Sequence, residues 1–429
     1  MHRPPTILFG AFDRHNFGDL LFPHVAAALL PGRELLFAGL ADRDLRALGG
    51  HRVRPLGTVA AELASRADAP PATLIHVGGE ILCCDAWQAA VMLLPDDEVA
   101  PIIARLDSQP AARMAWAQQR LADATGDPRA RAPYVATRAG FPAIGRVLHA
   151  GVGGADLARR DPALRAEVLA KLASADAVAV RDQRSLAQLE AAGLAPRLVP
   201  DPAVMVAELF GARIAERRRA GEPARVQRSF PQGYLAVQFG AEFGDDATLA
   251  NIAGQLDRFA AATGLGIALF RAGAAPWHDS LEVLQRAASR FRTAAVAIFE
   301  SLDVWDLCAL IAGSRGFCGS SLHGQIVAMA FGLPRVNLAI GAGGPPARAG
   351  EEGPVSDEGS ASDPDPAAKH RAFAETWELP GLPGVVDIDR IAEGLHAALA
   401  ADPDQLARLS RRLVEAYRPG FDALLAAAR

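Results

Sequence analysis

A short stretch near the C-terminal end of the chain combines hydroxyl, imidazole and free backbone groups in a pattern that suits an anion. Residues 313–338 predict a short strand, a turn of small residues, a helix that stops at Gly332, and a second strand. Ser320 and Ser321 lie where such a helix is capped, so several free N–H groups and the positive helix end would meet there. His323 would lie in the first helical turn, beside the bound anion. The alternative is a capped core helix with a buried histidine.

Glycine and polar residues follow other predicted strands, at residues 6–12, 73–77 and 146–150. The glycine and polar residues in the loops after these strands are Asn16, Gly18, Asp19, Gly79, Glu80 and Gly153. Open α/β sheets bind ligands at the carboxyl ends of their strands, so we expect these loops to line one cleft. Asp19 or Glu80 could accept a proton from a hydroxyl group there. The alternatives are a helix cap for Asp19 and a solvated loop carboxylate for Glu80.

Arg181 and Asp182 follow a further predicted strand and open the next helix. Asp182 is of a residue type that caps helices, so we expect Arg181 to point into the cleft, where a guanidinium could bind an anion. His15 and His76 also lie near these loops, but neither has partners at the spacing of a metal site. The sequence therefore predicts no metal.

The composition favours a cytoplasmic protein of two domains. With 429 residues, half of them hydrophobic, the chain exceeds the usual size of a single core. Its net charge of −5, without a basic cluster along a helix, gives no sign of nucleic-acid binding. The four cysteines show no CxxC spacing, which favours reduced thiols. No apolar signal region or membrane-length stretch is visible, and a peripheral contact with a membrane stays open.

Strands and helices alternate along most of the chain, a pattern typical of parallel sheets covered on both faces. A first alternation occupies residues 1–205 and a second occupies residues 233–400, with an arginine-rich linker at 206–232 between them. We therefore predict an α/β fold with two Rossmann-like domains. The loop after the first strand lacks the three-glycine dinucleotide fingerprint.

Several segments fall outside the simple alternation. Residues 95–141, with a helix at 111–124, are predicted to be an insertion, and a short helix is expected at 42–48. Residues 341–368 hold six acidic residues and one arginine among glycines and prolines, which predicts a disordered loop. Residues 401–429 predict a helical tail that packs back across both domains.

Several motifs, taken in order, resemble the polysaccharide pyruvyl transferase family. The matching pieces are Asn16-Phe-Gly-Asp19, Gly78-Gly-Glu80, Gly151-Val-Gly-Gly154, Val180-Arg-Asp-Gln-Arg-Ser185, Asp201-Pro202, Ser320-Ser-Leu-His-Gly324 and Gly332-Leu-Pro334. They run from the first strand to about Leu338, nearly four-fifths of the chain. Each motif is weak alone. Their order and spacing are specific for the family, and less so for its activity.

The resemblance implies an enzyme with a GT-B-like fold, in which two Rossmann-like domains face each other across a cleft. The family's characterised activity transfers the enolpyruvyl carbons of phosphoenolpyruvate to a sugar, usually closing a cyclic ketal. Phosphoenolpyruvate would be the donor substrate, no cofactor would be needed, and the acceptor would be a saccharide or lipid-linked saccharide of glycan or exopolysaccharide biosynthesis. The first domain would face the acceptor and the second would face the donor.

The residues and the resemblance together predict the roles of individual side chains. His323 and Asp19 would be catalytic. The donor would be bound by Arg181, Ser320, Ser321 and Gly324. The loops with Asn16, Gly18, Gly79, Glu80 and Gly153 would line the cleft on the acceptor side.

One departure from the family pattern concerns the donor. Family members with demonstrated activity often carry an arginine two residues before the histidine, and here that position is Ser321. Phosphoenolpyruvate carries a phosphate and a carboxylate, both of which suit arginine. We expect Arg271, Arg315 or Arg335 to be the spatial substitute.

Two further functions remain as alternatives. The first is a GT-B glycosyltransferase that uses a nucleotide-sugar donor, for which Glu300 is the carboxylate that could bind a ribose. The second is a non-catalytic protein that binds a glycan or a partner enzyme. The second alternative predicts a solvent-filled surrounding of His323 without convergent arginines.

Overall fold

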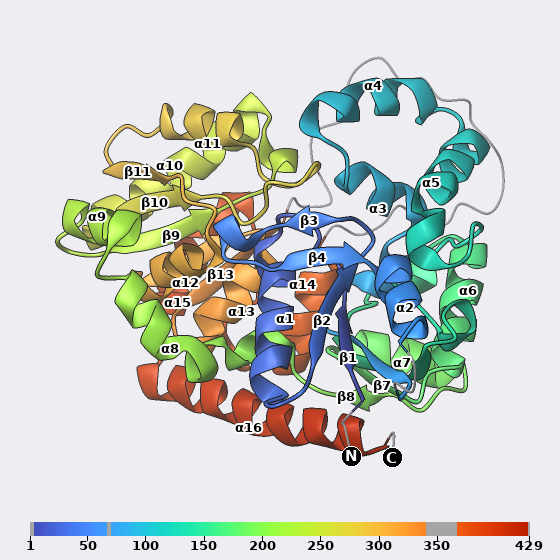
Figure 1. Cartoon of the computed structure of the whole chain (residues 1–429). Coiled ribbons are helices and arrows are strands. Elements are labelled where there is room, and N and C mark those ends of the chain that lie inside the picture. Colours follow the sequence, from blue (N-terminus) through green and yellow to red (C-terminus); the bar gives the residue numbers. More distant parts are fainter. Residues whose placement is uncertain (1–3, 67–69, 340–366, 428–429) are drawn as a thin grey trace.

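The fold consists of two β-sheets flanked by helices (Figure 1). The computed structural model describes residues 4–66, 70–339 and 367–427. Within them, one sheet has the strand order β3-β4-β2-β1-β5-β6-β7-β8 and the other the order β11-β10-β9-β12-β13-β14. The strand pairs are parallel, except that β3 pairs with β4 in antiparallel orientation. The prediction of an α/β fold with two separate, mainly parallel sheets is confirmed.

The first sheet and its helices occupy the N-terminal half of the chain. Its strands are β1 (Thr6–Phe9), β2 (Leu35–Gly39), β3 (Arg43–Asp44), β4 (Arg52–Pro55), β5 (Ala72–His76), β6 (Ile144–Val152), β7 (Ala177–Val180) and β8 (Arg197–Leu198). Its helices are α1 (Phe17–Leu29), α2 (Leu56–Ala64), α3 (Ala86–Met92), α4 (Asp96–Leu106), α5 (Pro110–Thr125), α6 (Pro162–Ala173) and α7 (Gln183–Ala191).

The second sheet follows after two connecting helices, α8 (Val206–Arg217) and α9 (Gly221–Ser229). Its strands are β9 (Tyr234–Gln238), β10 (Gly266–Phe270), β11 (Val296–Phe299), β12 (Gly316–Gly319), β13 (Arg335–Ala339) and β14 (Val385–Asp387). Its helices are α10 (Asp246–Thr263), α11 (Leu281–Ala288), α12 (Val304–Gly313), α13 (Leu322–Ala330), α14 (Ala368–Trp377), α15 (Ile391–Leu399) and α16 (Pro403–Ala427).

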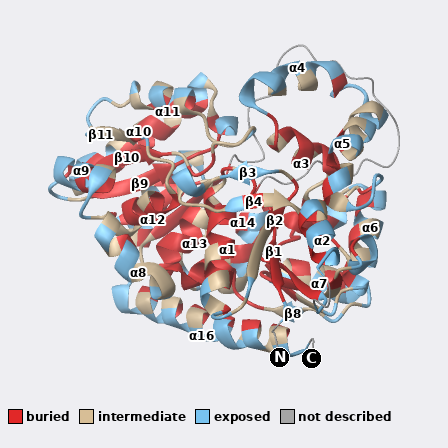
Figure 2. Cartoon of the chain, in the orientation of Figure 1, coloured by how far each residue is buried: buried red, intermediate tan, exposed pale blue. Residues whose placement is uncertain are grey.

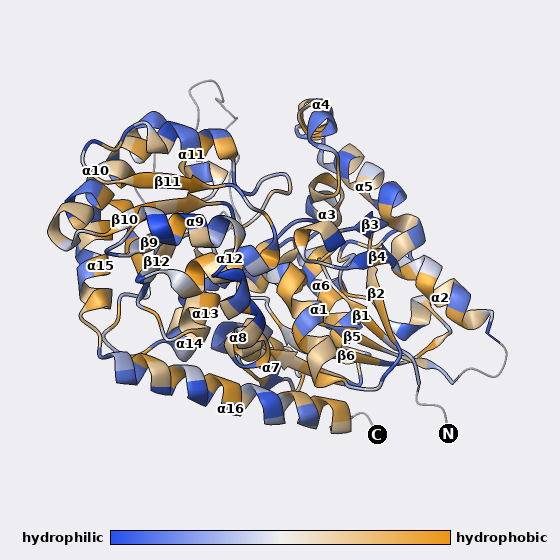
Figure 3. Ribbon diagram, turned by 60° about the vertical axis from the view of Figure 1, so that its left-hand side comes forward, coloured by the Kyte–Doolittle hydropathy of each residue, from blue (hydrophilic) through white to orange (hydrophobic). Residues whose placement is uncertain are grey.

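The central strands of both sheets are buried along their whole length. This holds for β1 and β5 in the first sheet and for β9, β10 and β13 in the second. Continuous apolar runs such as Ile7–Phe9 are typical of parallel strands that helices cover on both faces. Figure 2 shows the buried strands inside each half, and Figure 3 shows that β1, β5, β9 and β10 are largely hydrophobic.

A single hydrophobic core joins the two sheets. It contains Leu20 of α1, Ile311 of α12 and Leu413 of α16, so it draws on both halves of the chain. Helix α16 runs along one side of both halves and contacts β6, β7 and α13 (Figure 1). The C-terminal helix thus packs back across both sheets, as expected from the sequence. This shared core holds the two halves in one arrangement.

Some local predictions were wrong. Residues 42–48 form the short strand β3 and a turn of 3-10 helix instead of a helix, because Arg43 and Asp44 pair with β4 and Asp44 accepts a hydrogen bond from the backbone N–H of Arg46. The predicted insertion contains α5 near the expected position, but also α4, which the sequence reading missed. Acidic side chains in the first turn favour α4, since they complement the helix dipole.

The interval 206–232, predicted as a linker, folds into α8 and α9. Buried Val206, Ile214 and Val226 anchor these helices, while their arginines lie largely outside the core. The domain boundaries themselves stay a prediction. The predicted disordered loop at 341–368 lies outside the described residues, apart from its last two positions, where α14 begins.

Candidate active site between the two sheets

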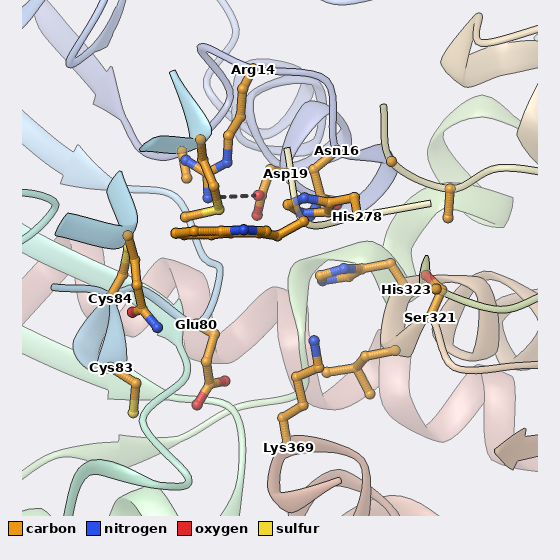
Figure 4. Close-up of a pocket in the computed structure, with 18 of the residues that line it drawn as sticks. Arg14, Asn16, Asp19, Glu80, Cys83, Cys84, His278, Ser321, His323 and Lys369 are labelled. Atoms are coloured by element: carbon orange, nitrogen blue, oxygen red, sulfur yellow. Dashed lines mark hydrogen bonds and ion pairs between the residues drawn. The ribbon is translucent and has the colours of Figure 1, made fainter. Parts of the chain in front are cut away.

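A cavity of about 370 Å³ lies between the two sheets, where loops at the carboxyl ends of their strands meet. We call it the central cavity (Figure 4). Its polar lining from the first half of the chain includes Arg14, Asn16, Asp19, Glu80, Tyr134, Arg160 and Arg181. Its polar lining from the second half includes Gln238, Glu242, His278, Asp279, Ser320, Ser321, His323 and Lys369. The loops predicted to meet in one cleft therefore do meet.

His323 enters the central cavity from the first turn of α13. Ser321 caps this helix by accepting a hydrogen bond from the N–H of Gly324 at 3.2 Å. The imidazole Nε2 lies 3.7 Å from Oδ2 of Asp201, a fully buried carboxylate that the sequence reading had placed in a motif without a role. Burial acts to raise the pKa of Asp201, but His323 and Arg181 outweigh it and hold this pKa below its usual value. Asp201 therefore stays ionised and orients the ring.

Close packing between the two halves explains the glycine at position 18. The His323 ring lies against the start of α1, where a Cβ atom on Gly18 would fall 1.9 Å from the ring atoms Cγ and Nδ1. The edge of Phe22 meets the same ring, with 5.1 Å between centroids. Only a residue without a side chain leaves space for the imidazole at this place.

Arg181 holds two carboxylates beside the central cavity. Its Nη1 donates to Asp201 at 2.9 Å and its Nη2 donates to Glu80 at 2.5 Å, and its side chain is only 2% exposed. Glu80 also accepts a hydrogen bond from the N–H of Ala155, so the alternative of a solvated loop carboxylate is wrong. A Cβ on Gly153 would lie 2.2 Å from Glu80, so the glycine makes room for this ion pair. The geometry gives Arg181 the role of positioning Asp201 and Glu80.

The loop at the start of α1 brings Asn16 and Asp19 to the central cavity. Asn16 is the helix cap, because its Oδ1 accepts a hydrogen bond from the N–H of Gly18 at 3.2 Å. The alternative of Asp19 as the cap is therefore wrong. Asp19 lies in the first turn of α1, 3.7 Å from Nη2 of Arg14, and Figure 4 shows the two side chains facing each other.

The predicted donor-binding residues of α13 differ in their placement. Ser320 and Ser321 line the central cavity, but the hydroxyl of Ser320 accepts a hydrogen bond from the N–H of Gly240 at 3.0 Å. Gly324 packs against Phe317 outside the lining, and a Cβ there would lie 2.5 Å from that ring. Gly79 has a φ of +89° and turns the chain next to Asp19.

The cations of the central cavity differ from those expected. Arg14, Arg160 and Lys369 line it, whereas Arg271, Arg315 and Arg335 are not among its lining residues. The guanidinium of Arg335, for example, pairs with Glu378 through two hydrogen bonds. Arg14 lies two positions before Asn16, so the loop motif could have pointed to it. Lys369 follows an acidic segment and gave no such signal.

Polar atoms of two of these arginines have no hydrogen bond among the described residues. The Nε atoms of Arg14 and Arg160 are buried without a hydrogen bond there, although Nη1 of Arg14 donates to Tyr134 at 2.6 Å and Nε of Arg160 lies 3.9 Å from the carboxylate of Asp156. Unpaired buried donors are costly, and an anionic ligand would satisfy them. Within the described ranges, no group of three or more His, Cys, Asp or Glu side chains is arranged to hold a metal ion.

One protein-family model matches part of this chain. The family model described as Polysaccharide pyruvyl transferase matches residues 158–341. The chain carries a polysaccharide pyruvyl transferase domain. A domain of this family implies an enzyme, and it implies a polysaccharide as acceptor. The matched range includes Arg181, Asp201 and His323, while the loops with Asn16 and Glu80 precede it.

Known structures resemble the chain over nearly its whole length. The UDP-GlcNAc 2-epimerase of Methanocaldococcus jannaschii is 11% identical, with a TM-score of 0.49 and coverage of 96% of this chain and 100% of that one. The alpha,alpha-trehalose 6-phosphate synthase of Burkholderia multivorans is 13% identical, with a TM-score of 0.46 and coverage of 100% and 99%. The search of curated proteins found no match. Among the described helices, none has the length and apolar character needed to span a membrane.

Proposed function

We propose that this pyruvyl transferase domain moves the enolpyruvyl group of phosphoenolpyruvate to two hydroxyls of a saccharide, forming a pyruvate ketal. The observation that carries the proposal is the placement of His323 and its buried partner Asp201 in a cavity that cations also line. An imidazole can give and take protons, and cations bind the phosphate and the carboxylate of the donor.

The donor carries up to three negative charges, and the cavity has matching groups. Arg14, Arg160 and Lys369 line it, together with the N-terminal end of α13. Guanidinium groups bind phosphate and carboxylate in a bidentate manner, and the positive end of a helix adds to this attraction. Ser321 stands where active family members often have an arginine. These three cations take the place of that arginine, so its absence need not abolish donor binding.

The reaction needs one proton at carbon and two carbon–oxygen bonds. C3 of phosphoenolpyruvate takes a proton, which makes a methyl group and leaves the positive charge at C2. A first sugar hydroxyl bonds to C2 and loses its proton. The bond from C2 to the phosphate oxygen then breaks and inorganic phosphate leaves. A second hydroxyl bonds to C2, and its proton goes to the departing phosphate, so one donor and two hydroxyls yield one ketal and one phosphate.

We assign the proton transfer to C3 to His323 and the removal of the first hydroxyl proton to Asp19. Asp19 then releases its proton to solvent and His323 takes one from solvent, so both groups begin the next turnover unchanged. Both side chains line the central cavity, and Figure 4 shows them on adjoining sides of it. Asp201 orients His323, because the carboxylate is ionised and buried next to the ring. Arg181 acts through Asp201 and Glu80 without touching the reacting atoms.

The acceptor would be a saccharide or a lipid-linked saccharide in glycan or exopolysaccharide biosynthesis, with the enzyme in the cytoplasm. The alternative of a nucleotide-sugar donor had rested on Glu300. This residue is exposed and is not among the lining residues of the central cavity, which leaves that alternative without its carboxylate.

Binding and turnover of donors test the proposal. Thermal shift and calorimetry should show that phosphoenolpyruvate binds, while UDP-glucose and UDP-N-acetylglucosamine do not. With a panel of bacterial polysaccharide fragments, phosphate release should match the pyruvate that mild acid later frees from the product. Stabilisation by a UDP-sugar alone would support the glycosyltransferase alternative. Binding of saccharide without turnover of either donor would support the binding protein.

A further inference from the structure

Trp277 is an aromatic side chain that the fold leaves open to the central cavity. It lies between β10 and α11, is 49% exposed, and is the exposed large hydrophobic residue of the described part of the chain. It is also the non-glycine residue with a positive φ, 64°, among the residues described. Such a backbone conformation costs a bulky residue free energy and persists at sites where function requires it.

The turn around Trp277 is fixed by hydrogen bonds on both sides. The N–H of Asp279 donates to the carbonyl of Gly273, and the carbonyl of His278 accepts from the N–H of Ala241 at 3.0 Å. The carboxylate of Asp279 accepts from the N–H of Ala272 at 2.6 Å and from Gln238 at 2.8 Å. Because the neighbours of Trp277 are held this way, the turn is set before any ligand arrives, which lowers the entropy cost of binding.

The same turn is tied to the opposite half of the chain. Asn16 Nδ2 lies 3.0 Å from His278 Nε2, Asn16 forms a backbone bridge with Gly273, and the N–H of Phe17 donates to the carbonyl of Ala272 at 2.7 Å. Trp277 is therefore held at a defined place relative to the loop that carries Asp19. A ligand on the indole would lie within the cavity that also holds His323.

The surroundings of Trp277 indicate the chemistry of that ligand. Glu242 and Asp19 line the same cavity, and their carboxyl oxygens offer hydrogen-bond acceptors to hydroxyl groups. A flat indole face beside such groups fits a pyranose ring, whose C–H bonds form an apolar face and whose hydroxyls form a polar rim. Phosphoenolpyruvate is small and highly anionic, so it gains nothing from an indole.

We propose that Trp277 is the stacking platform for a sugar ring of the acceptor, with Glu242 binding a hydroxyl at its rim. This inference rests on the proposed function in one respect, that the bound saccharide is the acceptor of the reaction. Whether a saccharide binds at Trp277 can be tested without turnover. It assigns acceptor recognition to a loop of the second half of the chain, in contrast to the expectation that the first half would face the acceptor.

Variants at position 277 test the platform. Trp277→Asn removes the ring and places at φ +64° a residue type that tolerates this conformation, so the variant should melt at the same temperature as the parent or higher. Trp277→Phe keeps an aromatic face. Methyl glycosides of glucose, galactose, mannose and N-acetylglucosamine serve as probes, with binding followed by ligand-observed NMR. At least one glycoside should bind the parent, about tenfold weaker to Trp277→Asn, and with intermediate affinity to Trp277→Phe.

The donor provides the control that separates this inference from the proposed function. Phosphoenolpyruvate affinity should be unchanged in both variants. If glycoside binding depends on Trp277 but phosphoenolpyruvate does not bind the parent, the platform stands and the pyruvyl transfer fails. If phosphoenolpyruvate binds but no glycoside binds the parent, or Trp277→Asn binds glycosides as the parent does, the platform is wrong. A lower melting temperature of Trp277→Asn would likewise show that the indole serves packing.

Discussion

The loops of the first sheet and the loops of the second sheet bring different kinds of group to the central cavity. The first sheet brings a set of charges that pair with one another, Arg181 with Glu80 and Asp201, besides Arg14, Arg160 and Asp19, which line the cavity. From the second come His323, which lacks a hydrogen bond at its buried Nε2, and the half-exposed Trp277. The comparison teaches that the paired charges of the first sheet can hold the site in shape, while the side chains that face the cavity meet the ligand.

Removing a residue from the paired charges around Arg181 should mainly lower the free energy of unfolding. Arg181→Ala leaves the buried Asp201 without its guanidinium hydrogen-bond partner, so we expect unfolding in urea to show a loss of about 3–5 kcal/mol. Arg184→Ala is a matched control, because Arg184 pairs with Glu375 at the surface and its loss should cost less than about 1 kcal/mol. A stable Arg181→Ala protein with weak phosphoenolpyruvate binding would reverse the assignment and make Arg181 a donor-binding residue, as first expected from the sequence.

Removing the imidazole of His323 should mainly lower turnover. His323→Ala removes the proposed proton carrier, and turnover should fall about a hundredfold or more, the usual scale for a lost general acid–base group. Phosphoenolpyruvate affinity, measured by calorimetry, should change far less, because Arg14, Arg160 and Lys369 remain. Turnover equal to that of the parent would exclude His323 from the chemistry.

The contact between Gly18 of the first half and His323 of the second can be disturbed without removing the imidazole. In Gly18→Ala the new methyl group would overlap the His323 ring, so the ring must move, and we expect turnover to fall about tenfold or more from misplacement alone. Gly254→Ala in α10 is the control, since a Cβ there meets nothing within 4 Å and an alanine favours a helix. Unchanged turnover in Gly18→Ala would mean that the position of His323 is not critical.

Sequence reasoning could predict those parts of the site that obey local rules. The alternation of strands and helices located the loops with Asn16, Glu80 and His323, and the capping preference located Ser321 and Asp182. What it could not reach were contacts between distant segments. Glu80 lies 101 residues from Arg181, and nothing near either residue indicates that the two form a pair.

The turn that carries Trp277 was missed for a related reason. Residues 271–280 have no hydrophobic periodicity, so the sequence offered only a loop between a strand and a helix. Its shape depends on Asp279 and Gln238, which come from different segments of the second sheet, and on Asn16 from the first. Lys369 reaches the central cavity only because α14 packs beside α7, which again no local pattern predicts.

The last test asks whether the Trp277 turn is built on a neutral carboxyl group. Burial raises the pKa of Asp279 to about 7, although hydrogen bonds from Ala272 and Gln238 oppose this shift. In the unfolded chain the same group titrates near its ordinary value of about 3.9. The folded protein therefore keeps a proton that the unfolded chain loses, and the stability that this proton provides is present at low pH and declines as the pH rises toward about 7.

Asp279→Asn should remove this dependence on pH. The amide oxygen of the new asparagine can still accept a hydrogen bond from the N–H of Ala272. Oε1 of Gln238 has no hydrogen-bond partner among the described residues. If the Gln238 side-chain amide rotates by half a turn, this oxygen can accept a hydrogen bond from the NH₂ group of the asparagine. We expect the variant to gain stability relative to the parent between pH 5 and pH 7, by roughly 2 kcal/mol over the whole interval and by at most about 1.4 kcal/mol per pH unit. Urea unfolding of both proteins at several pH values measures this difference directly. A constant difference across that range would show that Asp279 is ionised in the folded protein and that the turn is held by a charge.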